Sequence, residues 1–410
     1  MEGGWSPVST WTTQRWKYIQ STIPELFDLV ADPGETKNLH GQHPEQAAQL
    51  SQELADFAGT LTLRTAEATT ASAEELKALR GLGYAGGQAP AQKSDAPLRD
   101  IKETLQYAEQ VHHCMHLIDQ RETQEAQRIL ESVVAALPDY SKAWGTLGVC
   151  SAVQEDYAVA EQHFRRALDL DANQNFARIG LGRVLFAQDR LDECAEQLAT
   201  AVRVDRSALD AQYYLGEACR RLQRWDESRT ALSAATEIDP TFVEAQVALA
   251  DLALDQGDLD AAADRYQQVL QRDPSRTSAA LSLGRVQSQL ARDGEAIQTL
   301  EGLLSRNSRH VDGLTDLARV LATTEYPALR DVPRGVRLAE QACRLSDRRA
   351  AAPLRTLAVA QAAAGRLDAA IAAAESALAI ARESQSDSLS TVIAAELAEY
   401  RAAKQSQKPN

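Results

Sequence analysis

A period of 34 residues runs through most of the chain and limits the folds open to it. Leucine recurs at this spacing, and the residue after each leucine is glycine or alanine. The leucines are Leu147, Leu181, Leu215, Leu249, Leu283 and Leu317, and a second column of apolar residues comprises Ala167, Ala201, Ala235, Val269 and Leu303. Two antiparallel helices leave an apolar stripe that only a neighbouring pair can bury, so stacking demands an identical spacing. The period therefore predicts stacked helix pairs in which the small residue lets the two helices of one pair approach.

The composition is that of packed helices. Of the 410 residues, 44% are hydrophobic and 25% charged, only 5% are aromatic, and alanine, leucine, glutamate, glutamine and arginine are abundant. We expect a mainly α protein, an α-solenoid of stacked antiparallel helix pairs with a small N-terminal α+β remnant. The net charge is −15 and no basic run offsets it, so the sequence predicts neither a nucleic-acid nor a membrane partner.

Two patterns bear on the compartment. No stretch reaches the roughly 18 apolar residues that a membrane span needs. The N-terminus also lacks the charged-then-apolar order of a signal peptide. The chain as written is therefore expected to be cytoplasmic.

The N-terminal region has a pattern of its own. Residues 16–19 and 25–29 alternate in the manner of two short strands, and a proline-started amphipathic helix is expected from residue 44. A two-stranded ribbon is marginal by itself, so we expect residues 1–40 to be loosely held. A Thr/Ala-rich segment, a short helix over 74–82 and a Gly/Pro-rich stretch predict a tether. The expected divisions are strands and helix over 1–59, tether over 60–106, repeats over 107–384, and capping helix and tail over 385–410.

Side chains that could carry chemistry are few. The five cysteines stand singly, without a C-x-x-C pair, and are expected to be core residues. His112, His116 and Asp119 would share one helix face at the spacing of two-histidine metal sites, but no glutamate follows the first histidine and no distant third ligand is evident. We expect a polar helix face there, and no metal, cofactor or catalytic residue.

The repeat resembles the tetratricopeptide repeat, a helix pair of 34 residues. The family's positions are best kept at Trp144, Leu147, Gly148, Ala160, Phe164 and Ala167. The resemblance implies eight repeats, at 107–140, 141–174, 175–208, 209–242, 243–276, 277–310, 311–350 and 351–384, followed by a capping helix over 389–403. Positions 2, 5, 9 and 12 of the first helix in each repeat of this family line a concave groove, so a protein or peptide ligand is the expected partner.

The ten residues expected to bind this partner are here called the first-helix surface. They are Phe176, Ile179, Arg183, Tyr213, Glu217, Arg220, Val247, Asp251, Arg285 and Arg319. Tyr213 is the expected anchor, because an aromatic side chain has little to pack on there until a ligand arrives. Three of the arginines, at 183, 220 and 285, could receive an acidic peptide.

A plainer interpretation of the same surface remains open. Arg183 could pair with Glu217, and Asp251 with Arg285, between successive repeats. Exposed pairs of this kind contribute only about 0–1 kcal/mol each. The surface would then be merely solvated.

The N-terminal segment resembles the C-terminal end of type I sulfatases. WKYI (16–19) and PELFDLVADPGETKNL (24–39), with EELKALRGLGYAGG (74–87) further on, are similar to that family's last strands, turn and tail. The family's nucleophile lies in a C/S-x-P-x-R motif and its calcium ligands lie near the start of the enzyme. Neither region is present, and no cysteine here is followed two residues later by proline. The resemblance therefore implies no catalytic position in this chain.

The sequence as a whole predicts a protein-interaction scaffold that is not an enzyme. The alternative is the C-terminal portion of a longer sulfatase, a sulfuric ester hydrolase whose catalytic domain lies upstream and whose product is periplasmic or exported.

Overall fold

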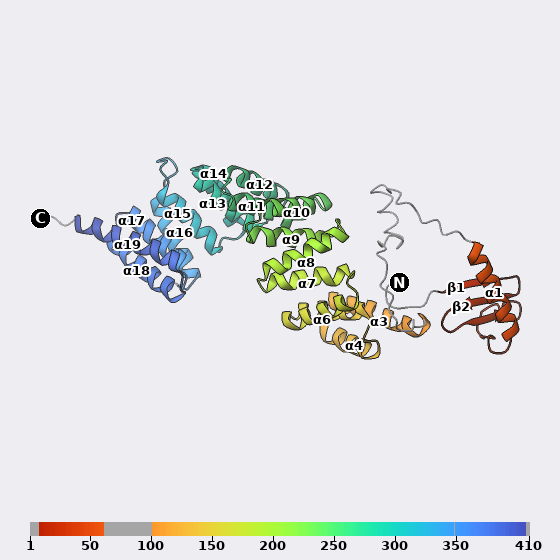
Figure 1. Ribbon diagram of the computed structural model, residues 1–410. Coiled ribbons are helices and arrows are strands. Elements are labelled where there is room, and N and C mark those ends of the chain that lie inside the picture. Colours follow the sequence, from red (N-terminus) through yellow and green to blue (C-terminus); the bar gives the residue numbers. More distant parts are fainter. Residues whose placement is uncertain (1–7, 61–100, 348, 407–410) are drawn as a thin grey trace. The chain divides into compact units, whose positions relative to one another are not determined.

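A computed structural model describes residues 8–60, 101–347 and 349–406 of the chain (Figure 1). The predicted tether, with its helix over 74–82, lies mostly outside these residues. The chain divides into two compact units, Met1–Ala211 and Gln212–Asn410. The division falls inside helix α9 (Leu209–Arg221).

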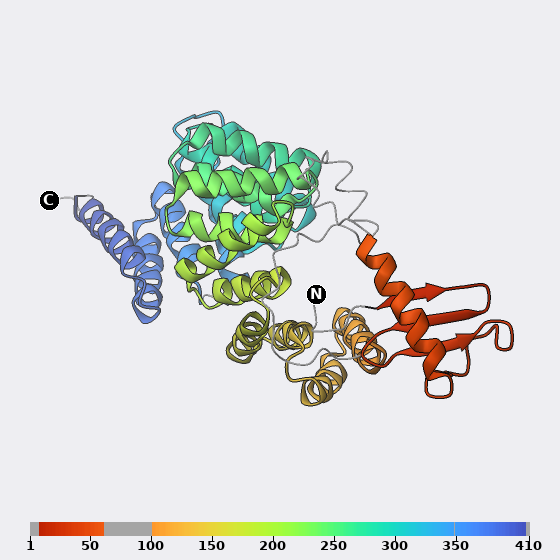
Figure 2. The same cartoon turned by 45° about the vertical axis from the view of Figure 1, so that its right-hand side comes forward.

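The N-terminal strands form one antiparallel sheet in the order β1-β2-β3. The strands are β1 (Ser9–Thr12), β2 (Trp16–Gln20) and β3 (Glu25–Asp28), and helix α1 (Pro44–Thr60) lies across the sheet (Figure 2). The strands β2 and β3 and the helix confirm the sequence prediction, but the expectation of only two strands was wrong. β1 is a mostly polar edge strand with one large apolar side chain, Trp11, so it lacks the alternation by which strands are recognised.

This sheet has a small core of its own, which the expected loose ribbon would not have. Tyr18 and Leu26 are buried against Ala47, Leu50 and Leu54 of α1. The turn that follows β3 is held by polar contacts. Lys17 Nζ lies 2.6 Å from Glu35 Oε2, and the Asp32 carboxylate accepts from the backbone N–H of Lys37 at 2.8 Å.

Helix pairs fill the rest of the described chain, as the period predicts. In the first compact unit they are α3 (Ile101–Asp119) with α4 (Thr123–Ala136), α5 (Ser141–Val153) with α6 (Tyr157–Leu170), and α7 (Asn175–Ala187) with α8 (Leu191–Val204). Next come α9 with α10 (Trp225–Ile238), α11 (Val243–Asp255) with α12 (Leu259–Arg272), α13 (Thr277–Gln289) with α14 (Asp293–Arg306), α15 (Val311–Thr323) with α16 (Val332–Leu345), and α17 (Ala351–Ala363) with α18 (Leu367–Glu383). The mainly α fold of stacked helix pairs is thereby confirmed.

Close packing within each pair explains the small residue after each leucine. A β-carbon built on Gly148 in α5 would lie 2.6 Å from the ring of Phe164 in α6. One built on Gly182 in α7 would lie 2.5 Å from Leu198 in α8. Real β-carbons do not approach other atoms this closely, so the glycines set the distance between the helices.

The leucine column is buried with one exception. Five of its six members are at most 8% exposed, whereas Leu215 is only half-buried, although the period predicts burial there too. Leu215 lies in α9, the helix in which the two compact units meet along the chain. All five cysteines are buried and none of them forms a disulfide within the described residues, as expected of core residues.

The last helix, α19 (Asp387–Ser406), covers the final pair. Its Ile393 and Leu397 are buried in the same core as residues of α17 and α18. Arg355 of α17 also makes a bidentate ion pair with Glu396, with N–O distances of 2.6 to 3.1 Å. The apolar face of the last repeat is thus covered by α19, which is the role of a capping helix.

Candidate functional site

The first-helix surface is spread over the first helices of five successive pairs. Its residues lie on α7 (Phe176, Ile179, Arg183), α9 (Tyr213, Glu217, Arg220), α11 (Val247, Asp251), α13 (Arg285) and α15 (Arg319). In the first compact unit, Phe176 is 44% exposed and Ile179 is half-buried. The guanidinium of Arg183 lies 3.3 Å from the carboxylate of Asp210, and both side chains are about half exposed.

The side chain of Tyr213 makes more packing contacts than the sequence analysis predicts. Its ring meets the ring of Phe242 edge-on, with centroids 5.2 Å apart, and that of Tyr214 at 5.1 Å. It also packs against the buried cluster that contains Leu232 and Leu252. Burial raises the pKa of the Tyr213 hydroxyl to about 12. The expectation that Tyr213 has little to pack on was therefore wrong, because the residue before α11 supplies an aromatic partner.

Arg220 is the centre of a polar network between α9 and α11. Its Nε donates to Glu217 Oε1 at 2.9 Å, and its Nη1 donates to Asp255. Burial lowers the pKa of Arg220, but its bonds to these two carboxylates outweigh that effect and raise it. Asp251 accepts a hydrogen bond from the hydroxyl of Tyr266, and burial raises the pKa of the Asp251 carboxyl.

The remaining two arginines differ in their partners. Arg285 Nε lies 2.6 Å from Asp316, a buried carboxylate of α15, so its partner is Asp316 rather than the predicted Asp251. Arg319 donates to the hydroxyl of Ser288 at 3.5 Å. The three arginines expected to receive an acidic peptide, at 183, 220 and 285, each already pair with a carboxylate of this chain.

Several partners in these networks were missed by the sequence analysis. Phe242, Asp255, Tyr266 and Asp316 lie in the next helix or the next repeat, at separations of 15 to 35 residues from the residues they contact. The 34-residue frame brings such positions together, but it does not fix which of several neighbours a long side chain reaches.

The side chains of His112 and His116 lie on an exposed face of α3. The rings of His112 and His116 meet edge-on in α3 with centroids 5.0 Å apart. Within residues 8–60, 101–347 and 349–406, no three His, Cys, Asp or Glu side chains are grouped so as to hold a metal ion.

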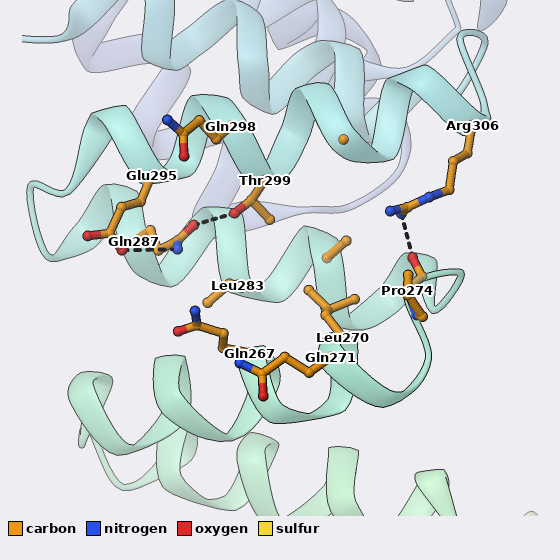
Figure 3. A pocket seen from close by; sticks show the side chains of 12 residues that line it. Gln267, Leu270, Gln271, Pro274, Leu283, Gln287, Glu295, Gln298, Thr299 and Arg306 are labelled. Atoms are coloured by element: carbon orange, nitrogen blue, oxygen red, sulfur yellow. Dashed lines mark hydrogen bonds between the residues drawn. The ribbon is translucent and has the colours of Figure 1, made fainter.

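A second candidate site is a crevice of about 370 Å³ bordered by α12, α13 and α14, here called the α12–α14 crevice (Figure 3). Its floor contains buried Ala280, Leu283 and Gln287. The Gln287 amide accepts from the hydroxyl of Thr299 at 2.8 Å and donates to Glu295 at 3.3 Å. At the far end Arg306 donates to the backbone carbonyl of Pro274. The other residues lining it are Gln267, Leu270, Gln271, Gln298 and Gly302.

Comparison with known families agrees with the paired helices and their spacing. Two family models, both described as the tetratricopeptide repeat, match the sequence, one over 115–175 and 179–241 and the other over 253–321. The chain carries tetratricopeptide repeats. Both matches fall within the helical region, so the resemblance of the N-terminal strands to sulfatases has no support from them.

Solved tetratricopeptide-repeat structures match the chain at low identity. A protein from Parabacteroides merdae is 12% identical, the match covering 62% of this chain and 98% of that one, with a TM-score of 0.46. The C-terminal part of a repeat protein from Cytophaga hutchinsonii is 16% identical, with 58% and 95% covered and a TM-score of 0.47. YrrB, a repeat protein with an unusual peptide-binding site, is 19% identical, with 45% and 95% covered and a TM-score of 0.40. No curated protein matches the sequence.

None of the described helices combines the length and the apolar character that crossing a membrane requires.

Proposed function

We propose that this chain is a protein-interaction scaffold without catalytic activity, and that a protein or peptide partner binds its first-helix surface. Tetratricopeptide repeats support the general role, because stacked repeats present the same helix positions side by side over a long surface. The described residues offer a partner aromatic, apolar and charged side chains together, which is the composition of binding hot spots.

One observation carries the proposal. The leucine column of the first helices is buried with the exception of Leu215, whereas the neighbouring columns on the same helices stay accessible. Phe176 is 44% exposed in α7, although burying a phenylalanine would stabilise the fold by about 1.5–3 kcal/mol. An exposed aromatic at the second residue of α7, one helical turn before Ile179, is accounted for by a partner that covers it.

The test compares two exposed aromatics of this chain. Phe176→Ala and the control Tyr326→Ala, which alters a 50% exposed residue outside the surface, should both melt like the wild type. A partner isolated from the source organism with the wild-type chain is then purified, and its Kd is measured for all three proteins. We expect Phe176→Ala to weaken binding about tenfold or more, and Tyr326→Ala to leave it unchanged. Equal binding by the wild type and Phe176→Ala would mean that partners bind elsewhere.

A further inference from the structure

The α12–α14 crevice contains a glycine that packing does not require. Gly302 is the tenth of the fourteen residues of α14, and a β-carbon built there would meet no atom of a neighbouring element within 4 Å. Glycine is the least favourable helix residue after proline. At Gly148 and Gly182 the close approach of a neighbouring helix explains the glycine, whereas at Gly302 only the open volume of the crevice remains.

The neighbouring repeat has a longer side chain at the same helix position and a smaller crevice beside it. A crevice of about 280 Å³ lies between α14, α15 and α16, one repeat further along. Its Leu304 and Leu317 stand 34 residues after Leu270 and Leu283 of the α12–α14 crevice. Gln341 is the tenth residue of α16, as Gly302 is of α14, and its amide donates to the carbonyl of Ser308 at 3.1 Å.

The rim of the α12–α14 crevice has the chemistry of a peptide-binding site. Exposed Gln267, Gln271 and Gln298 each carry a donor and an acceptor, which match the N–H and C=O of a peptide main chain. The floor provides Leu270 and Leu283 for an apolar side chain (Figure 3). Because the rim residues are exposed to solvent, the crevice suits a chain lying across it rather than an enclosed small molecule.

The two ends of the α12–α14 crevice carry opposite charges. Among its lining residues, Glu295 and Arg306 are the charged ones, and they stand at opposite ends of α14. Arg306 follows Glu295 by eleven positions, which is about 16 Å along a helix and about the length of five residues of extended chain. Among the hydrogen bonds of the described residues, Arg306 uses only Nη1, for the carbonyl of Pro274, so its other N–H groups can donate to a carboxylate.

We propose that the α12–α14 crevice binds an extended segment of a partner protein. A lysine or arginine of the segment pairs with Glu295, an aspartate or glutamate pairs with Arg306, and an apolar side chain between them sits beside Gly302 on Leu270 and Leu283. This site shares no residue with the first-helix surface, so it is independent of the function proposed above.

The experiment uses the full chain and two fluorescent, capped five-residue peptides. One has lysine, glycine, leucine, glycine and aspartate in that order, and the other has the reverse order. Gly302→Leu fills the crevice, whereas Gly302→Ala adds one methyl group and leaves most of it open. Both variants should melt at or above the wild-type temperature, because each removes a helix glycine. This separates loss of binding from loss of fold.

We expect one of the two peptide orders to bind the wild type and Gly302→Ala alike, and Gly302→Leu at least tenfold more weakly. Arg306→Glu should weaken the same peptide and favour a version in which lysine replaces aspartate. Equal affinity of the wild type and Gly302→Leu, or no binding of either peptide at about 1 mM, a concentration that detects even weak complexes, would overturn the proposal.

Discussion

The lack of a β-carbon at Gly148 allows α5 and α6 to pack closely. The ring of Phe164 occupies the space that a β-carbon at residue 148 would need, at 2.6 Å. Phe164 is only 1% exposed, so moving its ring aside would cost the free energy gained from its burial. The neighbouring α7 adds to this constraint, because a β-carbon on Gly180 would lie 2.4 Å from the same ring.

We therefore expect Gly148→Ala to lower the free energy of unfolding by about 1–3 kcal/mol, the usual cost of overpacking a core. The gain in helix propensity, at most about 1 kcal/mol, offsets part of this. Urea unfolding followed by circular dichroism measures the change. Gly302→Ala is the matched control, because the same added atom meets nothing there. Similar midpoints for the two variants would contradict the steric argument.

We expect His163 to make the stability of the fold depend on pH. Its ring lies 3.2 Å from the Ser151 hydroxyl and 5.7 Å from the Trp144 ring centroid. Burial lowers the pKa of His163 below the ordinary 6.5. The unfolded chain therefore takes up this proton at a higher pH than the folded chain does, so stability falls as the pH drops through about 6.5 toward the folded pKa.

His163→Gln should remove this part of the pH dependence. We expect the urea midpoint of the wild type to fall between pH 7.5 and 5.5, and that of His163→Gln to fall less. His112→Gln, which changes an exposed histidine of α3, serves as the control for the loss of a histidine. If His163→Gln and the wild type have the same slope, the histidine ionises equally in both states.

At the scale of elements, the turns inside the helix pairs repeat as regularly as the helices. Residues at 155, 189, 223, 257 and 291 all have a left-handed backbone, with φ between 56° and 77°. Each donates its N–H to the carbonyl three residues earlier, and the next N–H reaches five residues back, as in a Schellman cap. Glycine occupies this conformation without strain, yet only Gly257 of these five is a glycine.

This predicts a reciprocal pair of variants 34 residues apart. Ala291→Gly should raise the free energy of unfolding by up to about 1 kcal/mol, because a β-carbon is unfavourable in a left-handed backbone. Gly257→Ala should lower it by a similar amount, and its β-carbon would meet no atom within 4 Å. Thermal melting of both variants beside the wild type tests the idea. A stabilising Gly257→Ala would show that unfolded-state entropy outweighs the left-handed strain.

The helices were predictable from the sequence, but the details of the surface were not. A 34-residue period is enough to place helix pairs, because packed leucines and glycines must recur with the repeat. It could not show that Arg285 reaches Asp316, or that Phe242 packs on Tyr213, because these contacts join residues at unequal separations. Strand β1 and the half-burial of Leu215 were missed for a similar reason, since neither follows from a local pattern.

At the scale of the whole molecule, the described helices are stabilised by separate buried clusters rather than by one core. One buried cluster joins α3, α4 and α5 and includes Leu130, and another joins helices from α15 to α19 and includes Leu354. The two clusters share no residue. In repeat proteins each repeat is stabilised by its neighbours, so a local defect need not unfold distant repeats.

We therefore expect Leu130→Ala to act locally. Its side chain is fully buried, and its truncation should cost about 2–5 kcal/mol of local stability. Hydrogen exchange followed by mass spectrometry should show faster exchange in α3 to α5 and unchanged exchange in α15 to α18. Leu354→Ala, in the other cluster, should give the reverse pattern. A uniform loss of protection in either variant would mean that the whole chain unfolds as one cooperative unit, because only global unfolding spreads a single defect evenly over every helix.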